Sequence, residues 1–334
     1  MTNRYLLRLA PLLALIAGPT IGTAGPEFVP EVALGGFMDL QSEPGADGTE
    51  TPIHRLGQAE LDVDALIAPG VGLCLAAAWD PVTEAFGVGT AAVNLRFSPG
   101  DPAALCRGEI GDQTGLVAGR FDVPFGIDWL LYPSIDRPLV TMPLPVAATH
   151  GGWNADGLLG YGALGRWSVM VHATTGFDHS RVLDSGGEAI WTGRHAVGGR
   201  LGLAPWSGVS LGASAAGIEA IEDEQSQFLA GWDFFVTRGS LTVRGELLRL
   251  RTRGPEEHLD HGWYVAGQWD FGPWYGIARW DEWQPENQPR QRRLSLGAGM
   301  PVRGAVVLRA EYELWPDAGA ADRLVLQVAA GFGP

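Results

Sequence analysis

Two short strings in the sequence match motifs that carry chemistry in enzymes. The segment 208–212, GVSLG, fits the G-x-S-x-G pattern of a hydrolase nucleophile, which needs a sharp turn from a strand into a helix. The segment 160–165, GYGALG, fits the G-x-G-x-x-G pattern of a dinucleotide-binding loop, which needs a helix directly after it. The first lies inside an alternating strand pattern and the second precedes a tight turn, so neither predicts a catalytic or cofactor site.

Serine and histidine offer one further arrangement. Ser180 follows His179, and His172 lies in the preceding predicted strand. A hydrolase would need such a nucleophile beside a base, so this pair remains an alternative. The seven histidines show no H-E-x-x-H or similar ligand spacing, and we therefore expect neither a metal nor another cofactor.

Charged residues form a clearer pattern, because they alternate with apolar ones. In the segment 58–67, QAELDVDALI, apolar residues alternate strictly with Gln58 and three carboxylates, which is the period of a β-strand. In a soluble sandwich the apolar face would meet the core. In a membrane barrel it would meet lipid, and the acids would line the lumen. This segment alone does not decide between the two.

The whole chain repeats this pattern. It predicts sixteen strands and no helix, at 31–40, 57–67, 70–80, 88–97, 115–123, 154–163, 166–177, 190–203, 207–219, 227–237, 240–251, 261–270, 273–284, 291–300, 304–314 and 322–332. Short turns such as Arg238-Gly239 and Phe271-Gly272 alternate with longer segments, with one exception at 98–114. Short turns on one side and long loops on the other are typical of bacterial outer-membrane barrels.

Composition and the N-terminus agree with an exported barrel. Residues 1–24 carry two arginines, a short apolar run and a small-residue site, which predicts a signal peptide removed from a mature domain at 25–334. The chain contains no lysine, and its formal net charge of -15 argues against nucleic-acid binding, which requires a basic surface. Tryptophans at both ends of the strands are expected to form two interfacial girdles.

Alternation also predicts which charged side chains point into the lumen. They are Glu60, Asp62, Asp64, Arg96, Arg120, Asp122, Arg194, Arg200, Arg244, Glu246, Arg279, Asp281, Arg309, Glu311 and Glu313. A lining with both signs of charge would set ion selectivity. The other interpretation is that arginine–carboxylate pairs brace the wall. We expect most to be wall pairs and a few to contact solute.

The segment 124–153 is too long and irregular for an ordinary connection, which indicates a function of its own. We expect it to fold into the lumen and to narrow the pore. Its candidate constriction residues are Asp128, Asp136, Arg137 and His150. Asp136-Arg137-Pro138 fits equally well as a turn that fixes the segment to the wall.

Elsewhere, Cys74 and Cys106 are the only cysteines, and in an oxidising compartment they can form a disulfide or remain two buried thiols.

Three motifs in and around this segment carry a family resemblance. The strings GRFDVPFGID, DRPLVTMPLP and GGWNADG resemble segments of Gram-negative porins, loosely those grouped with the phosphate-selective porins. Arg279-Trp280-Asp281 resembles the later strand ends of such chains. The resemblance implies a water-filled barrel and a homotrimer. The absence of lysine and the acidic balance do not fit the basic pore of phosphate-binding members.

These observations together predict an all-β, transmembrane antiparallel barrel of about sixteen strands in the bacterial outer membrane. The predicted function is a porin that lets small hydrophilic solutes or ions diffuse through, with lipid and solute as partners, no cofactor and no enzymatic activity. The alternatives are a barrel hydrolase, a plugged barrel that acts as a surface or adhesin-type protein through its loops, and a soluble secreted β-protein.

Overall fold

The computed structural model describes ten stretches of the chain. They are residues 28–43, 52–80, 84–98, 113–131, 133–182, 188–220, 226–254, 257–286, 288–317 and 321–333. The chain divides into two compact units, Met1–Pro30 and Glu31–Pro334, and every element below belongs to the second. The expected signal peptide, 1–24, lies outside the described residues.

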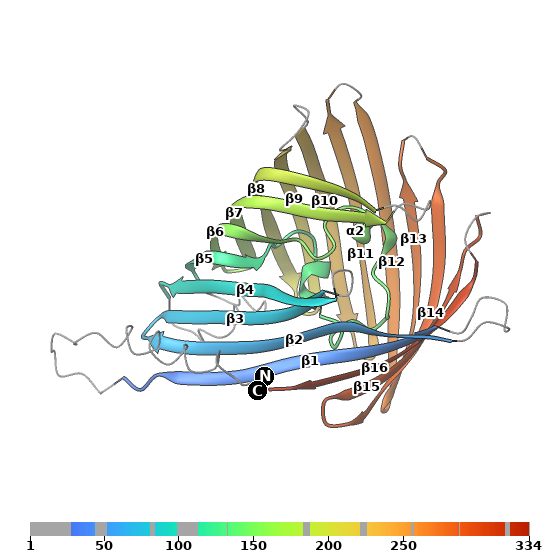
Figure 1. The fold of residues 1–334 in the computed structure, drawn as a ribbon, viewed down its shortest axis with the longest axis horizontal. Helices are drawn as coiled ribbons and strands as arrows, with labels where there is room; N and C mark the ends of the chain where they lie inside the picture. The colour runs from blue at the N-terminus through green and yellow to red at the C-terminus, as the bar shows by residue number, and fades with distance from the viewer. Residues whose placement is uncertain are drawn as a thin grey trace, which may run out of the picture. The chain divides into compact units, whose positions relative to one another are not determined.

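Sixteen antiparallel strands form one closed barrel (Figure 1), as the sequence predicts. The strands are β1 (Glu31–Glu43), β2 (Ile53–Ala68), β3 (Val71–Asp80), β4 (Ala85–Arg96), β5 (Gly115–Asp122), β6 (Asn154–Leu164), β7 (Trp167–Val182), β8 (Glu188–Trp206), β9 (Val209–Ala220), β10 (Ser226–Arg238), β11 (Leu241–Arg253), β12 (His258–Phe271), β13 (Trp274–Gln284), β14 (Gln291–Arg303), β15 (Val306–Leu314) and β16 (Arg323–Phe332). Leu40 of the first strand lies opposite Val328 of the last, which closes the ring. No helix in the described part of the chain is long and apolar enough to cross a membrane.

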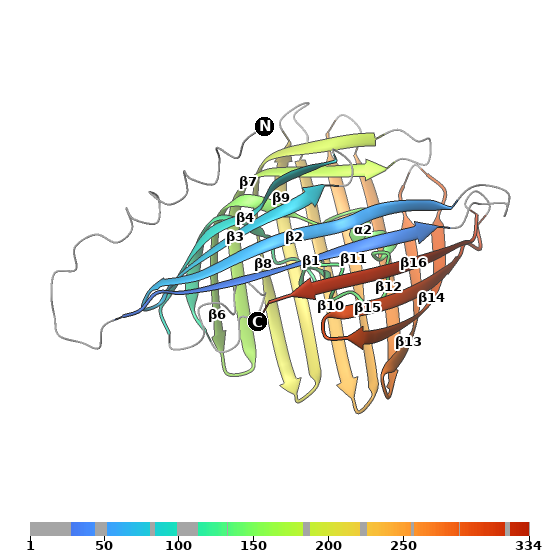
Figure 2. The ribbon, with the colours of Figure 1, turned by 60° about the horizontal axis from the view of Figure 1, so that its bottom comes forward.

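Tight turns lie along one rim of the barrel (Figure 2). Gly239 and Gly272 open two of these turns with φ of 61° and 69°, the left-handed conformation that two-residue hairpin turns require. The turn between β8 and β9 falls at 207–208, a little beyond the predicted Ala204–Trp206, because the extended backbone of β8 continues through Trp206. The connection from β4 to β5 is the long exception at this rim, as predicted.

The alternation of burial along the strands separates an apolar outer face from an inner one. Leu34, Leu61, Val171 and Val197 are exposed on the outer surface, as a barrel surrounded by lipid requires. Tryptophans near the tight turns are also exposed, as a girdle predicts: Trp167, Trp206, Trp269 and Trp274. One tryptophan expected in the opposite girdle, Trp283, is instead buried inside the barrel with 1% exposure, because it falls on an inward position of β13.

The connection between β5 and β6 is folded and lies inside the barrel (Figure 1). It contains a 3-10 turn, η3 (Asp128–Leu131), and a single helical turn, α2 (Leu144–Ala147). The sequence predicts no helix here. One turn is too short to show a 3.6-residue period, and α2 starts with a proline in its first turn, where the missing N–H costs nothing.

Candidate functional site

The inner segment, residues 123–153, starts and ends at one point of the wall. The Val123 amide donates to the Trp153 carbonyl at 2.8 Å and closes its base. Phe125, Val146 and Trp153 are buried in one apolar cluster with wall residues such as Leu248. Burying these large side chains favours the folded position of the segment by the hydrophobic effect, and hydrogen bonds then fix its path.

The first set of hydrogen bonds lies on β8, β9 and β11. Glu246 Oε1 accepts from the Ile127 amide at 2.5 Å and from the Asp128 amide at 3.1 Å. Ser214 Oγ accepts from the Gly126 amide at 3.1 Å, and Arg200 Nε donates to the Gly126 carbonyl at 2.7 Å. Buried backbone groups need such partners, so these wall side chains are what allows the irregular chain to lie here.

The second set centres on Thr141. Arg279 donates to the Thr141 carbonyl at 2.6 Å, and Glu311 accepts from the Thr141 amide at 2.8 Å. Arg293 donates to the Met142 carbonyl at 2.5 Å and pairs with Asp281 at 2.9 Å. Arg279 is 2% exposed and Glu311 is 0% exposed. Charges this deeply buried persist only when they are paired and hydrogen-bonded, and the segment supplies part of that pairing.

The third set carries the segment to the junction of the first and last strands. Arg309 donates to the carbonyls of Ser134 at 2.8 Å and Ile135 at 2.6 Å. The Tyr275 hydroxyl donates to the Pro138 carbonyl at 2.9 Å. Arg137 Nη2 donates to Gln58 Oε1 of β2 at 3.1 Å. The segment is therefore bonded to the inner wall from β8 round to β2, and we call these three sets the clamp.

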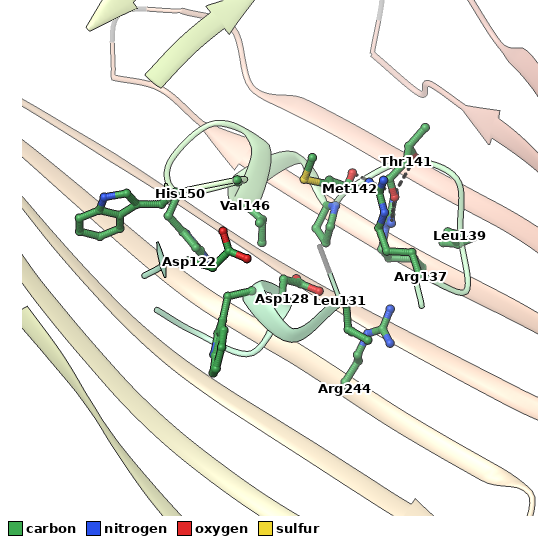
Figure 3. Close-up of a pocket in the computed structure, with 16 residues that line it drawn as sticks. Asp122, Asp128, Leu131, Arg137, Leu139, Thr141, Met142, Val146, His150 and Arg244 are labelled. Carbon is green, nitrogen blue, oxygen red and sulfur yellow. Dashed lines mark hydrogen bonds between the residues drawn. The ribbon is translucent and has the colours of Figure 1, made fainter. Parts of the chain in front are cut away.

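A small cavity lies between the inner segment and the wall (Figure 3). Asp122, Asp128, Arg137, His150 and Arg244 are among its lining residues. Its volume is about 20 Å³, little more than the roughly 10–15 Å³ that one water requires. Burial raises the pKa of Asp128, although the nearby Arg244 opposes this shift. The cavity is too small to be the path of a solute.

Seven of the predicted lumen residues lie on inward strand positions and are buried: Arg244, Glu246, Arg279, Asp281, Arg309, Glu311 and Glu313. Their charged groups interact with the inner segment and with one another, so they do not line an open part of the pore. Arg120 likewise forms a pair with Asp156 at 3.1 Å, and Asp122 accepts from Asn154 at 2.8 Å.

The constriction candidates in the inner segment separate into two kinds. Asp128, Arg137 and His150 are buried, and the His150 ring packs on Phe125 with centroids 4.8 Å apart. Asp136 is exposed. Of the four, Asp136 is therefore the one whose side chain is open to solvent.

Three acids of β2 remain on the partly exposed inner surface. Glu60, Asp62 and Asp64 alternate along the strand, and Asp64 lies opposite Cys74 of β3, which is buried and disulfide-bonded. Each acid is only partly buried. Arg96, near the tight-turn rim on β4, is also half-buried. The inner wall at β2 is therefore acidic and accessible to water, in contrast to the covered wall at β11–β15. Cys106 lies outside the described residues, so its pairing with Cys74 stays a prediction.

Several clamp residues have no forerunner in the sequence prediction. Ser214 is a single polar residue with no motif, and Thr141 and Gln58 lie in strings noted for other reasons, which say nothing of their contacts. Arg293 could have been found, because it alternates with Leu294 and Leu296 and therefore falls on the inner face of β14.

The sequence matches no protein-family model and no curated protein. Solved structures share the fold. An anion-selective porin from Comamonas acidovorans aligns with a TM-score of 0.66 at 13% identity, covering 92% of this chain and 100% of that one. Salmonella typhi OmpF in complex with daunomycin aligns with a TM-score of 0.66 at 10% identity, covering 90% and 97%. The trimer form of OmpT, an outer-membrane protein of Vibrio cholerae, aligns with a TM-score of 0.62 at 8% identity, covering 91% and 100%.

These alignments cover almost the whole barrel. The fold is that of an outer-membrane porin barrel, and it agrees with the localisation in the bacterial outer membrane that the sequence predicts.

Proposed function

We propose that this protein is a diffusion channel for small hydrophilic solutes or ions, narrowed by its inner segment. One observation carries the proposal. The segment buries the inward charges of β11–β15, whereas Glu60 and Asp62 on β2 keep access to water. Barrels of sixteen strands leave an aqueous channel when nothing fills them. We place the solute path between the inner segment and the acidic face of β2.

The sign of the lining then favours cations. Two arginines that could balance the acids, Arg279 and Arg309, are instead bonded to carbonyls of the inner segment, and Arg96 lies near the tight-turn rim of β4. Asp136, on the segment itself, adds a further exposed carboxylate. Charged side chains that line a pore select ions of the opposite sign, so potassium should permeate more readily than chloride.

The experiment is conductance of the refolded protein in a planar lipid bilayer. We expect stepwise, ohmic openings and, in a potassium chloride gradient, a reversal potential of the cation-selective sign. A folded barrel that never conducts would refute the channel. A channel with the anion-selective sign would refute the proposed lining and leave the channel standing.

A plugged barrel is the second candidate, because the clamp reaches from β8 round to β2. In that case the barrel would act through its loops, as a surface or adhesin-type protein, and would pass nothing. Swelling of proteoliposomes in isosmotic sugar distinguishes the two, since only an open channel lets sugar and water enter.

For the hydrolase alternative, His172 is 1% exposed and its ring packs on Trp153 with centroids 5.3 Å apart, so a substrate has no access to it.

A trimer is the oligomeric state we expect, because a porin-fold neighbour is described in trimer form. Mass measurement of the detergent-solubilised protein, before and after heating, would test it. A single mass equal to one barrel in mild detergent would contradict the trimer.

A further inference from the structure

The outer face of β11 changes from apolar to basic toward the rim opposite the tight turns. Its outward side chains include Leu247 and then three exposed arginines at alternate positions: Arg249, Arg251 and Arg253. The residues between them point inward and are buried: Leu248, Leu250 and Thr252. This alternation fixes the three guanidinium groups on the outer surface, with their Cα atoms about 6.8 Å apart. We call them the arginine row.

Neighbouring strands place the arginine row relative to the membrane. Trp232 of β10 and Trp263 of β12 lie opposite Leu247 on either side, and the three strands run side by side in Figure 1. Trp232 is 67% exposed. Indole rings favour the membrane interface, and Arg249 is one outward position beyond this level. On the proposed outer-membrane placement, the arginine row therefore starts at the depth of the lipid head groups.

The arginine row has little counter-charge of its own. Arg251 pairs with Glu257, with side chains 45% and 52% exposed. In the part of the chain that the structure describes, neither Arg249 nor Arg253 forms a salt bridge or a side-chain hydrogen bond, although the Glu257 carboxylate is close enough to Arg253 for their charges to interact. The outward acid on β9, Glu219, lies opposite Ser226, which in turn lies opposite Arg253, so it is two strands away. Exposed ion pairs contribute little, and Arg251 can exchange Glu257 for another anion.

We propose that the arginine row binds the phosphate groups of anionic lipid in the outer leaflet. A guanidinium binds phosphate through two parallel N–H···O bonds, and three of them in line can bind two phosphates of one head group or of adjacent lipids. The chain is strongly acidic overall, with a formal net charge of -15. The arginine row is therefore a local basic surface on an acidic protein. The phosphate groups of lipids are the anions that are always present at this depth of the membrane.

Native mass spectrometry of the folded protein, titrated in detergent with bis-phosphorylated lipid A, tests the proposal. The variant R249Q/R251Q/R253Q should bind this lipid at least about tenfold more weakly, since each lost charge-assisted contact alone costs roughly that factor. Binding to the wild type should also weaken as sodium chloride is added. The dephosphorylated lipid should bind both proteins equally weakly.

A matched control makes the same charge change at the tight-turn rim. Arg166, Arg238 and Arg303 are exposed there, and R166Q/R238Q/R303Q should bind lipid A as the wild type does. Heat-modifiable gel mobility checks folding, and R249Q and R253Q singly serve if the triple variant does not fold. Equal binding by the triple variant, or equal binding of the dephosphorylated lipid to the wild type, would overturn the proposal. Conductance is independent of this test, so a failed channel and a failed lipid site are distinguishable.

Discussion

Arg279 shows how single residues hold the inner segment in place. Its guanidinium pairs with Asp281 at 3.0 Å, lies 3.6 Å from Glu311 and donates to the Thr141 carbonyl. Because all these groups are buried, none can be replaced by water without cost. The arginine therefore stabilises the wall and the segment at the same time.

Replacing Arg279 with methionine should destabilise the barrel. The apolar stem is kept, but Asp281 and Glu311 lose a buried cation, and breaking such a pair costs about 3–5 kcal/mol. Urea unfolding of the refolded protein measures the change. Arg292→Met is the matched control on the exterior. Arg292 is 38% exposed in its pair with Asp317, and losing an exposed ion pair should change the stability far less than losing the buried one. Similar losses in the two variants would show that the clamp adds little stability.

Asp128 offers a test by pH. Burial raises its pKa above the ordinary value of 3.8, so the ionised form costs the folded state free energy wherever the unfolded carboxyl is charged. Asp128→Asn should therefore raise the urea midpoint at neutral pH. The gain should shrink as the pH falls and vanish below about 3.8, where the carboxyl is protonated in both states. If the increase in the urea midpoint did not change with pH, the ionisation of Asp128 would not be its cause.

At the scale of elements, the inner segment and the barrel wall are separable. Residues 133–142 contribute the carbonyls bound by Arg279, Arg293 and Arg309, and the strands on both sides pair without them. Replacing these ten residues with a short glycine–serine linker should leave a folded barrel and increase its unit conductance. A deletion of 286–289, between β13 and β14, leaves the clamp intact and should not change it. Unchanged conductance in the first variant would mean that the segment does not narrow the path.

The β4–β5 connection carries the second prediction about elements. Cys74 is disulfide-bonded on the inner face of β3, and Cys106 is the one other cysteine in the sequence. We expect a bond between them. Peptide mapping under non-reducing conditions should give one cross-linked pair of peptides, which separates on reduction. Alkylation of both thiols in the folded, unreduced protein would contradict the bond.

The strands could be predicted from the sequence because their signal is local. All sixteen predicted strands correspond to observed ones, with ends that differ by a few residues, since a two-residue period tells which face a side chain takes. Period does not tell what covers that face. Trp283 and Arg279 are on the same inward face of β13. The sequence predicted an interfacial position for Trp283 and a lumen position for Arg279, because nothing in the strand itself reveals that the inner segment covers both.

The path of the inner segment could be predicted only in part. Its length and its lack of period indicated a special role, and the expectation that it enters the lumen needed nothing more. Its contacts depend on single polar residues far away in the chain, such as Ser214 and Gln58. No spacing rule connects Gly126 with a serine 88 residues later, so these pairs emerge only from the folded barrel.

At the scale of the whole molecule, paired and accessible charges lie on different parts of the inner wall. The buried arginines and carboxylates of β11–β15 pair with one another and with the inner segment, whereas the acids of β2 stay partly exposed. An ion that crosses the barrel should therefore encounter mainly carboxylates. Net charge alone could not establish this, because it counts clamp, lumen and outer surface together.

The variant E60Q/D62N separates the β2 wall from the general acidity of the chain. It removes two inward carboxylates without touching the clamp, so the barrel should fold, conduct and lose most of its preference for potassium over chloride. Reversal potential in a potassium chloride gradient measures the preference. The control E257Q/D317N removes two carboxylates outside the strands, of which Glu257 is exposed and Asp317 is half-buried. If its reversal potential moved as far as that of E60Q/D62N, charge at the loops would set selectivity and the acidic wall of β2 would not. If only E60Q/D62N moves it, the ions pass along β2.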